Sequence, residues 1–278
     1  LVIGLLGQLQ NLLAYAIPTA ALLLLAGLRF RKRVFELEEH GSEPQQESDS
    51  SDWLPAWVLW LAAPFVIVLL AGAIVTPWEF DVREYHLQAP KEWFQEGSIT
   101  FMPHNVYANM PLGPQILSLP AMAAMPGELN WWWGALVGKV VIATYVPLTA
   151  LALFTCGRRF ISTTAGVVAA LVFVSIPWMA HVSIATYVDG ALACNLFLAL
   201  YAAMLAIPKL ASQQDHARQE EVVATPNYGA VTLAGFLAGA AVSCKYPGLL
   251  FVVSPLMVVF ACAGGLQQCL SRAALARL

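Results

Sequence analysis

One run of apolar residues constrains the fold more than any other feature. Residues 54–76 contain no charge over 23 positions, and a helix of that length crosses the roughly 30 Å hydrocarbon core of a bilayer. Only 11% of the chain is charged and 59% is hydrophobic, so lipid must be the solvent for most of it. Six further runs resemble the first, at residues 1–28, 137–155, 161–180, 187–207, 228–243 and 248–263. We therefore predict an all-α integral membrane protein, a multispanning helical bundle with about seven spans.

Polar stretches divide the chain into segments. We expect residues 1–28 to be a truncated first span and residues 29–53 to be a disordered cytoplasmic loop. Residues 54–263 would form the transmembrane module, and residues 264–278 the cytoplasmic tail of a chain that continues. Within the module, residues 77–130 form a large outer loop, in which we expect short helices at the membrane surface.

The distribution of basic residues orients the predicted spans. Ten of the fourteen Lys and Arg residues follow the first span, follow the third span, or lie in the second polar loop and the tail. The opposite side has only Arg83, Lys91 and Lys245, with Lys139 near a span end, where we expect it to reach the interface. Because Lys and Arg are retained in the cytoplasm, the 77–130 loop should face outward. The basic residues form no extended stripe, which argues against nucleic-acid binding.

The outer loop concentrates acidic and aromatic side chains. Asp81, Glu84 and Tyr85 have the i, i+3, i+4 spacing of residues that share a helix face. The same spacing fits a structural role, in which Asp81 caps a short helix and Glu84 completes a capping box. Both interpretations stay open. Further along, a helix should restart near residue 88, with Trp93 and Phe94 against the membrane surface.

Two ionisable residues at later span ends add to this picture. Asp189 is the only acid at an apolar span, and Lys245 stands before Tyr246 at the end of another. An ionisable residue in such a place is a functional-site hypothesis, although pairing, capping or snorkelling would also account for it. Carboxylates with a few lysines at one membrane face suit a phosphate-bearing lipid, because Lys neutralises phosphate while a carboxylate activates an acceptor hydroxyl.

No sequence motif indicates a metal or nucleotide site. His86, His104 and His181 fall on the outer side, and with nearby acids they could bind a divalent metal. There is no HExxH or other tight ligand spacing, so we interpret them as scattered loop histidines. The five cysteines have no CxxC spacing and lie in or near apolar runs. GxSxG, P-loop and dinucleotide fingerprints are also missing from the sequence.

Three segments together resemble a known family. FDVREYHLQAPKEWFQEG, TYVDGALA and SCKYPGLL are similar to the first outer loop and the outer span ends of bacterial family 39-type glycosyltransferases. These belong to the GT-C superfamily, with the protein O-mannosyltransferases and lipid A aminoarabinose transferases. The resemblance covers about residues 54–263. It implies a multi-pass enzyme of the bacterial inner membrane that moves a sugar, by inverting displacement, from a polyprenyl-phosphate donor to a lipid, glycan or protein acceptor.

The resemblance also implies residue roles. The catalytic acid maps onto Asp81, with Glu84 as the alternative, because many members have adjacent acids and this chain separates them. Donor phosphate and substrate binding would fall to Lys245, Lys91, Tyr85, His86 and Tyr246. Asp189 and His104 would support the site or a metal.

Other functional classes fit part of this pattern. A transporter or lipid flippase would also have several spans and outward-facing polar groups, with intramembrane charges along a path. Such a protein should show repeats and charges near the midplane, whereas here the charges gather at one face beside a long loop. A noncatalytic membrane scaffold is weakened by the acids and aromatic residues of that loop. The sequence favours the enzyme.

Overall fold

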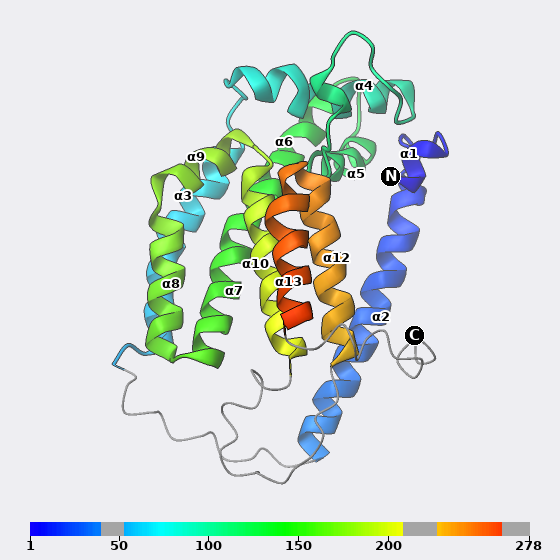
Figure 1. Ribbon diagram of the computed structural model, residues 1–278. Helices are drawn as coiled ribbons and strands as arrows, with labels where there is room; N and C mark the ends of the chain where they lie inside the picture. The colour runs from blue at the N-terminus through cyan, green and yellow to red at the C-terminus, as the bar shows by residue number, and fades with distance from the viewer. Residues whose placement is uncertain (40–52, 208–226, 263–278) are drawn as a thin grey trace.

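The protein folds into a bundle of helices with a smaller layer of short helices over one end (Figure 1). The structure is a computed structural model that describes residues 1–39, 53–207 and 227–262. Across these residues every regular element is a helix, and no strand is present. Four helices are long and apolar enough to cross a membrane: Leu12–Arg29 within α2 (Leu12–Glu39), Ala56–Ala73 from η1 (Ala56–Ala62) and α3 (Ala63–Ala73), Asn130–Phe160 from α6 (Asn130–Ala143) and α7 (Tyr145–Phe160), and α10 (Asp189–Ala206).

A proline breaks the span that the sequence predicts at residues 161–180. The chain instead forms α8 (Thr163–Ser175) and α9 (Pro177–Ala185), which are bent by 58° relative to each other. Pro177 begins α9, and Ile176 before it has extended backbone angles, because a following proline disfavours the α conformation. If the bent pair counts as one span, the described chain has five.

The last two predicted spans form apolar helices that are short for a membrane span. The structure has α12 (Tyr228–Cys244) and an apolar stretch at Leu249–Phe260, which comprises η6 (Leu249–Val253) and most of α13 (Ser254–Cys262). Both are apolar, but each has fewer than 18 residues. The structure therefore confirms an all-helical protein with membrane-length helices, and it does not confirm seven spans.

The N-terminal segment differs from its prediction at both ends. Residues before Leu12 form the short helix α1 (Val2–Leu5) and a turn through Gly7, so the first span does not begin at residue 1. The turn is held by Asn11, whose side chain bonds Gln8 and the backbone of Leu13. At its other end α2 continues to Glu39, beyond residue 29, where the loop was predicted; its Arg, Lys, Glu and Leu residues are good helix formers. Most of the predicted polar segments at 29–53, 208–227 and 264–278 lies outside the described residues, which omit 40–52, 208–226 and 263–278.

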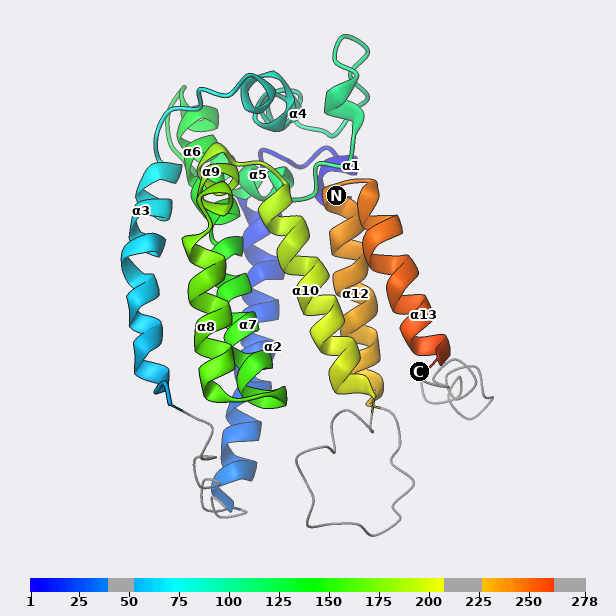
Figure 2. The same cartoon turned by 60° about the vertical axis from the view of Figure 1, so that its left-hand side comes forward.

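Small residues set the contacts inside the bundle. Gly157 on α7 and Gly166 on α8 face each other so closely that a Cβ on Gly157 would lie 2.6 Å from Gly166 Cα. The contact between α10 and α12 is formed by fully or nearly fully buried alanines, among them Ala199, Ala203 and Ala234. Figure 2 shows α7, α8, α10, α12 and α13 all running lengthwise below the end layer.

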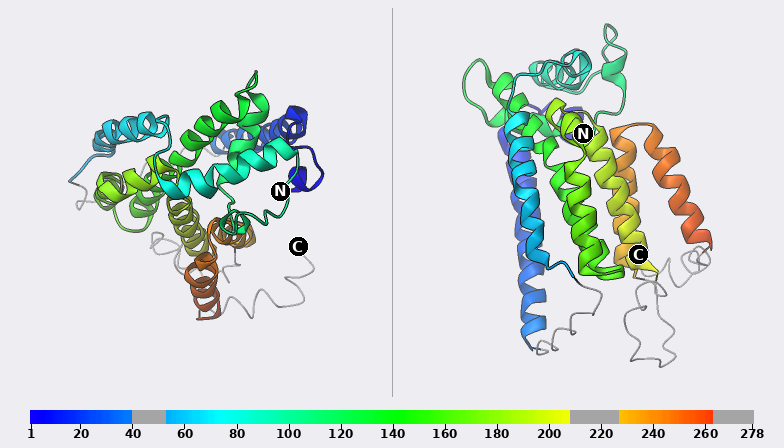
Figure 3. Two further views of the ribbon diagram at one scale, coloured as in Figure 1. Left: turned by 90° about the horizontal axis from the view of Figure 1, so that it is seen from above. Right: turned by 90° about the vertical axis from the view of Figure 1, so that its left-hand side faces the viewer.

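We call the end layer, residues 78–124, the cap. It contains η2 (Val82–His86), α4 (Gln88–Glu96), η3 (Tyr107–Asn109), η4 (Gln115–Leu117) and α5 (Ser118–Ala124). Figure 3 shows these short helices lying across the end of the bundle. The helix predicted near residue 88 is confirmed as α4, with Pro90 in its first turn.

Most of one hydrophobic core lies in the cap, and a few residues from the N-terminal segment, α6 and α9 complete it. Trp93 and Phe94, predicted to lie against the membrane, are only 5% exposed and pack inside this core. The indole N–H of Trp93 donates to the carbonyl of Thr100 at 2.9 Å, which satisfies its polar atom within the cap. Gly134 and Gly138 on α6 leave no room for a Cβ beside α5, so α5 packs directly against α6. These contacts fix the cap to the bundle.

Candidate functional site

A cavity of about 280 Å³ lies between the cap and the adjoining ends of the bundle helices. Its wall is assembled from segments far apart in the sequence: the end of η2 with the residue before that helix, the turn before η4, α9, the start of α10 and the end of α12. We call it the cap cavity. Its lining residues are Asp81, Tyr85, His86, Met110, Pro111, Leu112, Trp178, His181, Val182, Tyr187, Val188, Asp189, Cys244, Lys245 and Tyr246.

A π-helical turn decides which loop residues face this cavity. The backbone N–H of Leu87 donates to the carbonyl of Val82 at 2.9 Å, an i to i+5 bond. The wider turn places Tyr85 and His86 on the cavity side together with Asp81. Glu84, which an α-helix would bring to that face, is instead exposed and lies outside the cavity wall. The shared face predicted for Asp81 and Tyr85 is thus present, and Glu84 does not belong to it. Turns of this kind are frequent at functional sites.

The structure does not support the capping interpretation of Asp81. Asp81 occupies the position before η2, but its side chain accepts no capping hydrogen bond. Glu84 is held by its backbone: its carbonyl oxygen accepts a hydrogen bond from Asn105 Nδ2 at 2.8 Å. A capping box requires both side chains to bond backbone N–H groups. The Asp81 carboxylate is therefore an exposed group at the cavity wall.

Asp189 and Lys245 meet at the cavity from two different helix ends. Lys245 Nζ lies 3.3 Å from Asp189 Oδ1, and the side chains are 51% and 44% exposed. Asp189 begins α10, where the helix dipole favours a negative charge. Pairing, one of the alternatives for these residues, is thus confirmed, but the pair lines a cavity and stays accessible. Tyr246 extends the wall beyond Lys245 and is 65% exposed.

A left-handed residue turns the chain into the cavity after α9. Thr186 has φ of 76° and ends the helix, which is uncommon for a residue other than Gly or Asn. Gln115, fully buried, donates through Nε2 to the Thr186 carbonyl at 3.3 Å. The next residues, Tyr187 and Asp189, face the cavity as a result.

A second acid–base pair, His181 with Glu79, was not predicted from the sequence. His181 on α9 lines the cavity, and its Nε2 lies 3.7 Å from Glu79 Oε1. The indole N–H of Trp78 donates to the same oxygen at 3.0 Å, and the ring of Trp178 lies 5.0 Å from the His181 ring. His181 was only one of several outer histidines, and Glu79 was one of six loop acids. In the sequence, the feature that could have pointed to Glu79 was its position two residues before Asp81.

His86 forms a neutral part of the wall. The ring is 3% exposed and packs between Tyr85, at 4.3 Å, and Tyr187, at 5.6 Å between centroids. Burial lowers the pKa of His86 to about 4; Asp189 opposes this shift and Lys245 adds to it. Burial, followed by the charge of nearby carboxylates, raises the pKa of Tyr85 and of Tyr187. At neutral pH these three rings are therefore uncharged hydrogen-bonding groups.

Two predicted site residues lie elsewhere. Lys91 Nζ sits over the ring of Trp131, 4.3 Å from its centroid, and does not line the cap cavity. His104 Nε2 lies 2.9 Å from Glu92 Oε2, on the cap. The first contact joins α4 to α6 and the second lies within the cap, so neither residue is placed to bind a group in the cavity.

Lys139 behaves differently from a lysine that reaches the interface. Its side chain is completely buried, and Nζ donates to the carbonyl of Val75 at 2.6 Å. The ring of Trp78 lies 5.9 Å from the same nitrogen. The predicted snorkelling is thus wrong, because the bond fastens α6 to the chain just beyond the end of α3.

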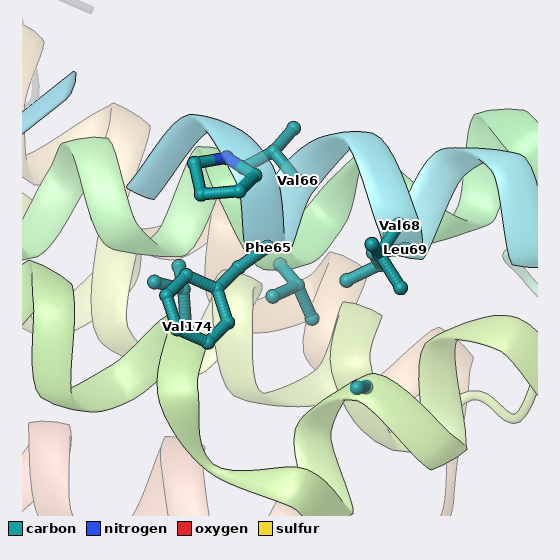
Figure 4. A pocket seen from close by; sticks show the side chains of 8 residues that line it. Phe65, Val66, Val68, Leu69 and Val174 are labelled. Carbon is teal, nitrogen blue, oxygen red and sulfur yellow. The ribbon is translucent and has the colours of Figure 1, made fainter. Parts of the chain in front are cut away.

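An apolar groove of about 340 Å³ adjoins the site (Figure 4). It lies between α3, α7, α8 and α9, and its wall includes Phe65, Leu69, Val174 and Ala180. The helix α9 therefore contributes to both spaces, with Ala180 in the groove and its neighbour His181 in the cap cavity.

No metal site accompanies this arrangement in the described part of the chain. There, no group of three or more His, Cys, Asp or Glu side chains is placed to hold a metal ion. The site offers two carboxylates, one ammonium group, one accessible imidazole and several neutral hydroxyl or ring groups. Such a set can neutralise an anion, accept a proton and hydrogen-bond a polyhydroxylated ligand.

In comparisons with known proteins, no family model, no curated protein and no solved structure matches the chain.

Proposed function

We propose that this protein is a GT-C-type membrane glycosyltransferase that transfers a sugar from a polyprenyl-phosphate donor to an acceptor hydroxyl. The observation that supports this is the cap cavity, where Asp81 and the Asp189–Lys245 pair meet at the end of a membrane bundle. The proposal includes the bacterial inner membrane, seven spans and an extracytoplasmic cap, as the excess of Lys and Arg on the other side favours.

In this proposal the donor phosphate binds to Lys245. The ammonium group is half-exposed and bonded to one carboxylate oxygen, so a phosphate can take the place of Asp189 as its partner. A charge-assisted bond of this kind is about twice as strong as a neutral one. His181, held by Glu79, provides a second polar contact on the same wall.

Asp81 then acts as the general base. Its carboxylate takes the proton of the acceptor hydroxyl as that oxygen attacks the anomeric carbon. The bond between the anomeric carbon and the phosphate oxygen breaks, and polyprenyl phosphate leaves with the electron pair. Lys245 neutralises the charge that develops on the leaving phosphate. Attack from the face opposite the leaving group inverts the anomeric centre.

The neutral wall of the cavity suits the transferred sugar. Tyr85, Tyr187 and His86 are uncharged at neutral pH, so they can bond sugar hydroxyls without competing for the phosphate. Aromatic side chains also provide a flat apolar surface in the wall of the cavity.

The apolar groove suits the polyprenyl chain. The wall of the groove is almost entirely hydrocarbon. Only one helix, α9, stands between the groove and the cap cavity. A lipid phosphate can therefore place its head at Lys245 while its chain follows the groove between Phe65 and Val174 (Figure 4).

The apolar groove beside the cap cavity also supports one alternative function. A flippase also needs a polar head-group cavity beside an apolar groove that is open to lipid. The two functions differ in their products: the transferase joins the sugar to an acceptor, whereas the flippase moves an intact lipid between leaflets.

The test uses the full-length protein in membranes with a labelled polyprenyl-phosphate sugar. We expect wild type to transfer label, and Asp81→Asn at equal expression to lose about 10²- to 10⁴-fold of the rate, the usual contribution of a general base. Glu84→Gln, which alters the competing acid, should retain transfer because Glu84 lies outside the cavity. Full activity of Asp81→Asn would refute the assignment of the base. Movement of the intact lipid without any transfer would favour the flippase.

A further inference from the structure

A separate hollow of about 490 Å³ lies on the cap side of the molecule and shares no lining residue with the cap cavity. Its polar wall comes from Gln10, Gln95, Glu128 and Asn130, and its aromatic wall includes Trp131. We call it the amide hollow. No step of the proposed reaction uses these residues.

Contacts between distant segments shape the amide hollow. Gln10 Nε2 donates to the carbonyls of Phe94 and Gln95 at 2.9 and 3.2 Å, which joins the start of the chain to the end of α4. Lys91 lies over the Trp131 ring and restricts its orientation. Asn130 Oδ1 accepts the backbone N–H of Trp131 at 2.7 Å. The hollow is thus a tertiary feature built from four segments rather than the surface of one loop.

The chemistry of the wall selects a class of ligand. Side-chain amides both donate and accept hydrogen bonds, and a carboxylate accepts them, while an indole offers an apolar face and one N–H. Among the residues that the structure describes, no Lys, Arg or His side chain lines the hollow, and Glu128 gives it a negative charge. This set matches a neutral or amine-bearing polyhydroxylated molecule and disfavours a phosphate. The cap cavity, with Lys245 and His181, has the opposite preference.

The two sites lie at opposite ends of one short helix. His86 and the rest of η2 come just before α4, whereas Phe94 and Gln95 are near its end. Eight residues at 1.5 Å each separate His86 from Phe94 by about 12 Å along the chain of helices. A single sugar ring does not cover that separation, but a linear oligosaccharide does.

We propose that the amide hollow binds the distal sugars of an oligosaccharide acceptor whose near end presents its hydroxyl to Asp81. This rests on the proposed transferase function and narrows its acceptor to a glycan of several units. A protein side chain or a single small sugar would leave the hollow unused.

The test measures binding in the absence of donor, so it does not depend on transfer. The full-length protein in nanodiscs is mixed with mannotetraose, chitotetraose, the matching monosaccharides and a sulfated tetrasaccharide, and binding is followed by saturation-transfer NMR. We expect a neutral or amino-sugar tetrasaccharide to bind about tenfold or more tightly than its monosaccharide and than the sulfated one. Gln95→Ala with Glu128→Gln should weaken that binding about tenfold, since hydrogen bonds involving a charged group are lost.

Controls separate this inference from the proposed function. Glu96→Gln, an exposed change on α4 outside the hollow, should leave glycan binding unchanged. Trp131 is left intact because it packs against the cap core. Absence of binding by both tetrasaccharides, or binding that the Gln95 and Glu128 changes do not weaken, overturns the inference. If transfer still depends on Asp81 in that case, the proposed function stands without it.

Discussion

Replacing Lys245 by Met separates a binding role from a structural one. The substitution keeps a long apolar stem and removes the charge that faces Asp189 at 3.3 Å. Both side chains are about half-exposed, and exposed pairs of this kind contribute about 0.2–1 kcal/mol to stability. Unfolding should therefore become easier by less than about 1 kcal/mol.

The expected loss of donor binding is larger. A hydrogen bond to a charged group contributes about 1.5–3 kcal/mol, which corresponds to roughly 10- to 150-fold in affinity. Asp189→Asn should act in the opposite direction on binding, because it removes both the competing partner of Lys245 and a negative charge beside the phosphate. We expect a donor KM lower by a few-fold, since the pair contributes at most about 1 kcal/mol.

The assay measures donor affinity and thermal unfolding on the same nanodisc preparation, with transfer kinetics alongside. Arg83→Met is the matched control, because Arg83 is a basic residue of η2 that is exposed and does not line the cavity. The reasoning fails if Lys245→Met weakens donor binding no more than Arg83→Met does. It also fails if Asp189→Asn weakens binding as much as Lys245→Met, because the pair would then only hold the two helix ends together.

Two further predictions concern stability. The pKa of His86 is lowered to about 4, so between about pH 6.5 and pH 4 the unfolded chain binds a proton that the folded protein does not. The free energy of unfolding in detergent should fall by roughly 3 kcal/mol over that range, and His86→Phe should remove this fall; an unchanged pH profile would contradict it. On α8, Gly166→Ala should destabilise by about 1–3 kcal/mol, because its Cβ would lie 2.5 Å from the Phe154 carbonyl oxygen. Gly235→Ala, with nothing within 4 Å, should change stability by less than about 1 kcal/mol in the same denaturation assay.

The sequence predicted the components of the cap cavity better than their surroundings. Asp189 and Lys245 were selected because ionisable groups are costly at membrane spans, and Asp81 was selected from its spacing in the outer loop and from the family resemblance. The fold places all three in the lining of one cavity. Tyr85, His86 and Tyr246 join them there. Glu84 was misplaced because residue spacing cannot reveal a π turn: the i to i+5 bond at Leu87 shifts the face by one residue.

Other errors have equally physical causes. Trp93 and Phe94 have the composition of a membrane-interface belt, but aromatic residues also fill the core of a compact cap, and only tertiary contacts distinguish the two. Lys91 was assigned to phosphate from the family resemblance, whereas in the fold its ammonium group lies over the Trp131 ring. Pro177 itself predicts a break in the helix, but the length of the apolar run at residues 161–180 outweighed it in the prediction of a single span.

The buried bond of Lys139 bears on how the chain enters the membrane. A lysine opposes insertion of an apolar helix, by up to about 2.5–3.5 kcal/mol at the helix centre, and here the ammonium group of Lys139 donates to the Val75 carbonyl. Residue 75 is synthesised before residue 139, so the acceptor has already been delivered when the lysine leaves the translocation machinery. Insertion from the N-terminus thus provides α6 with its partner in time, whereas a chain permuted to begin at α6 would have to insert the same lysine alone.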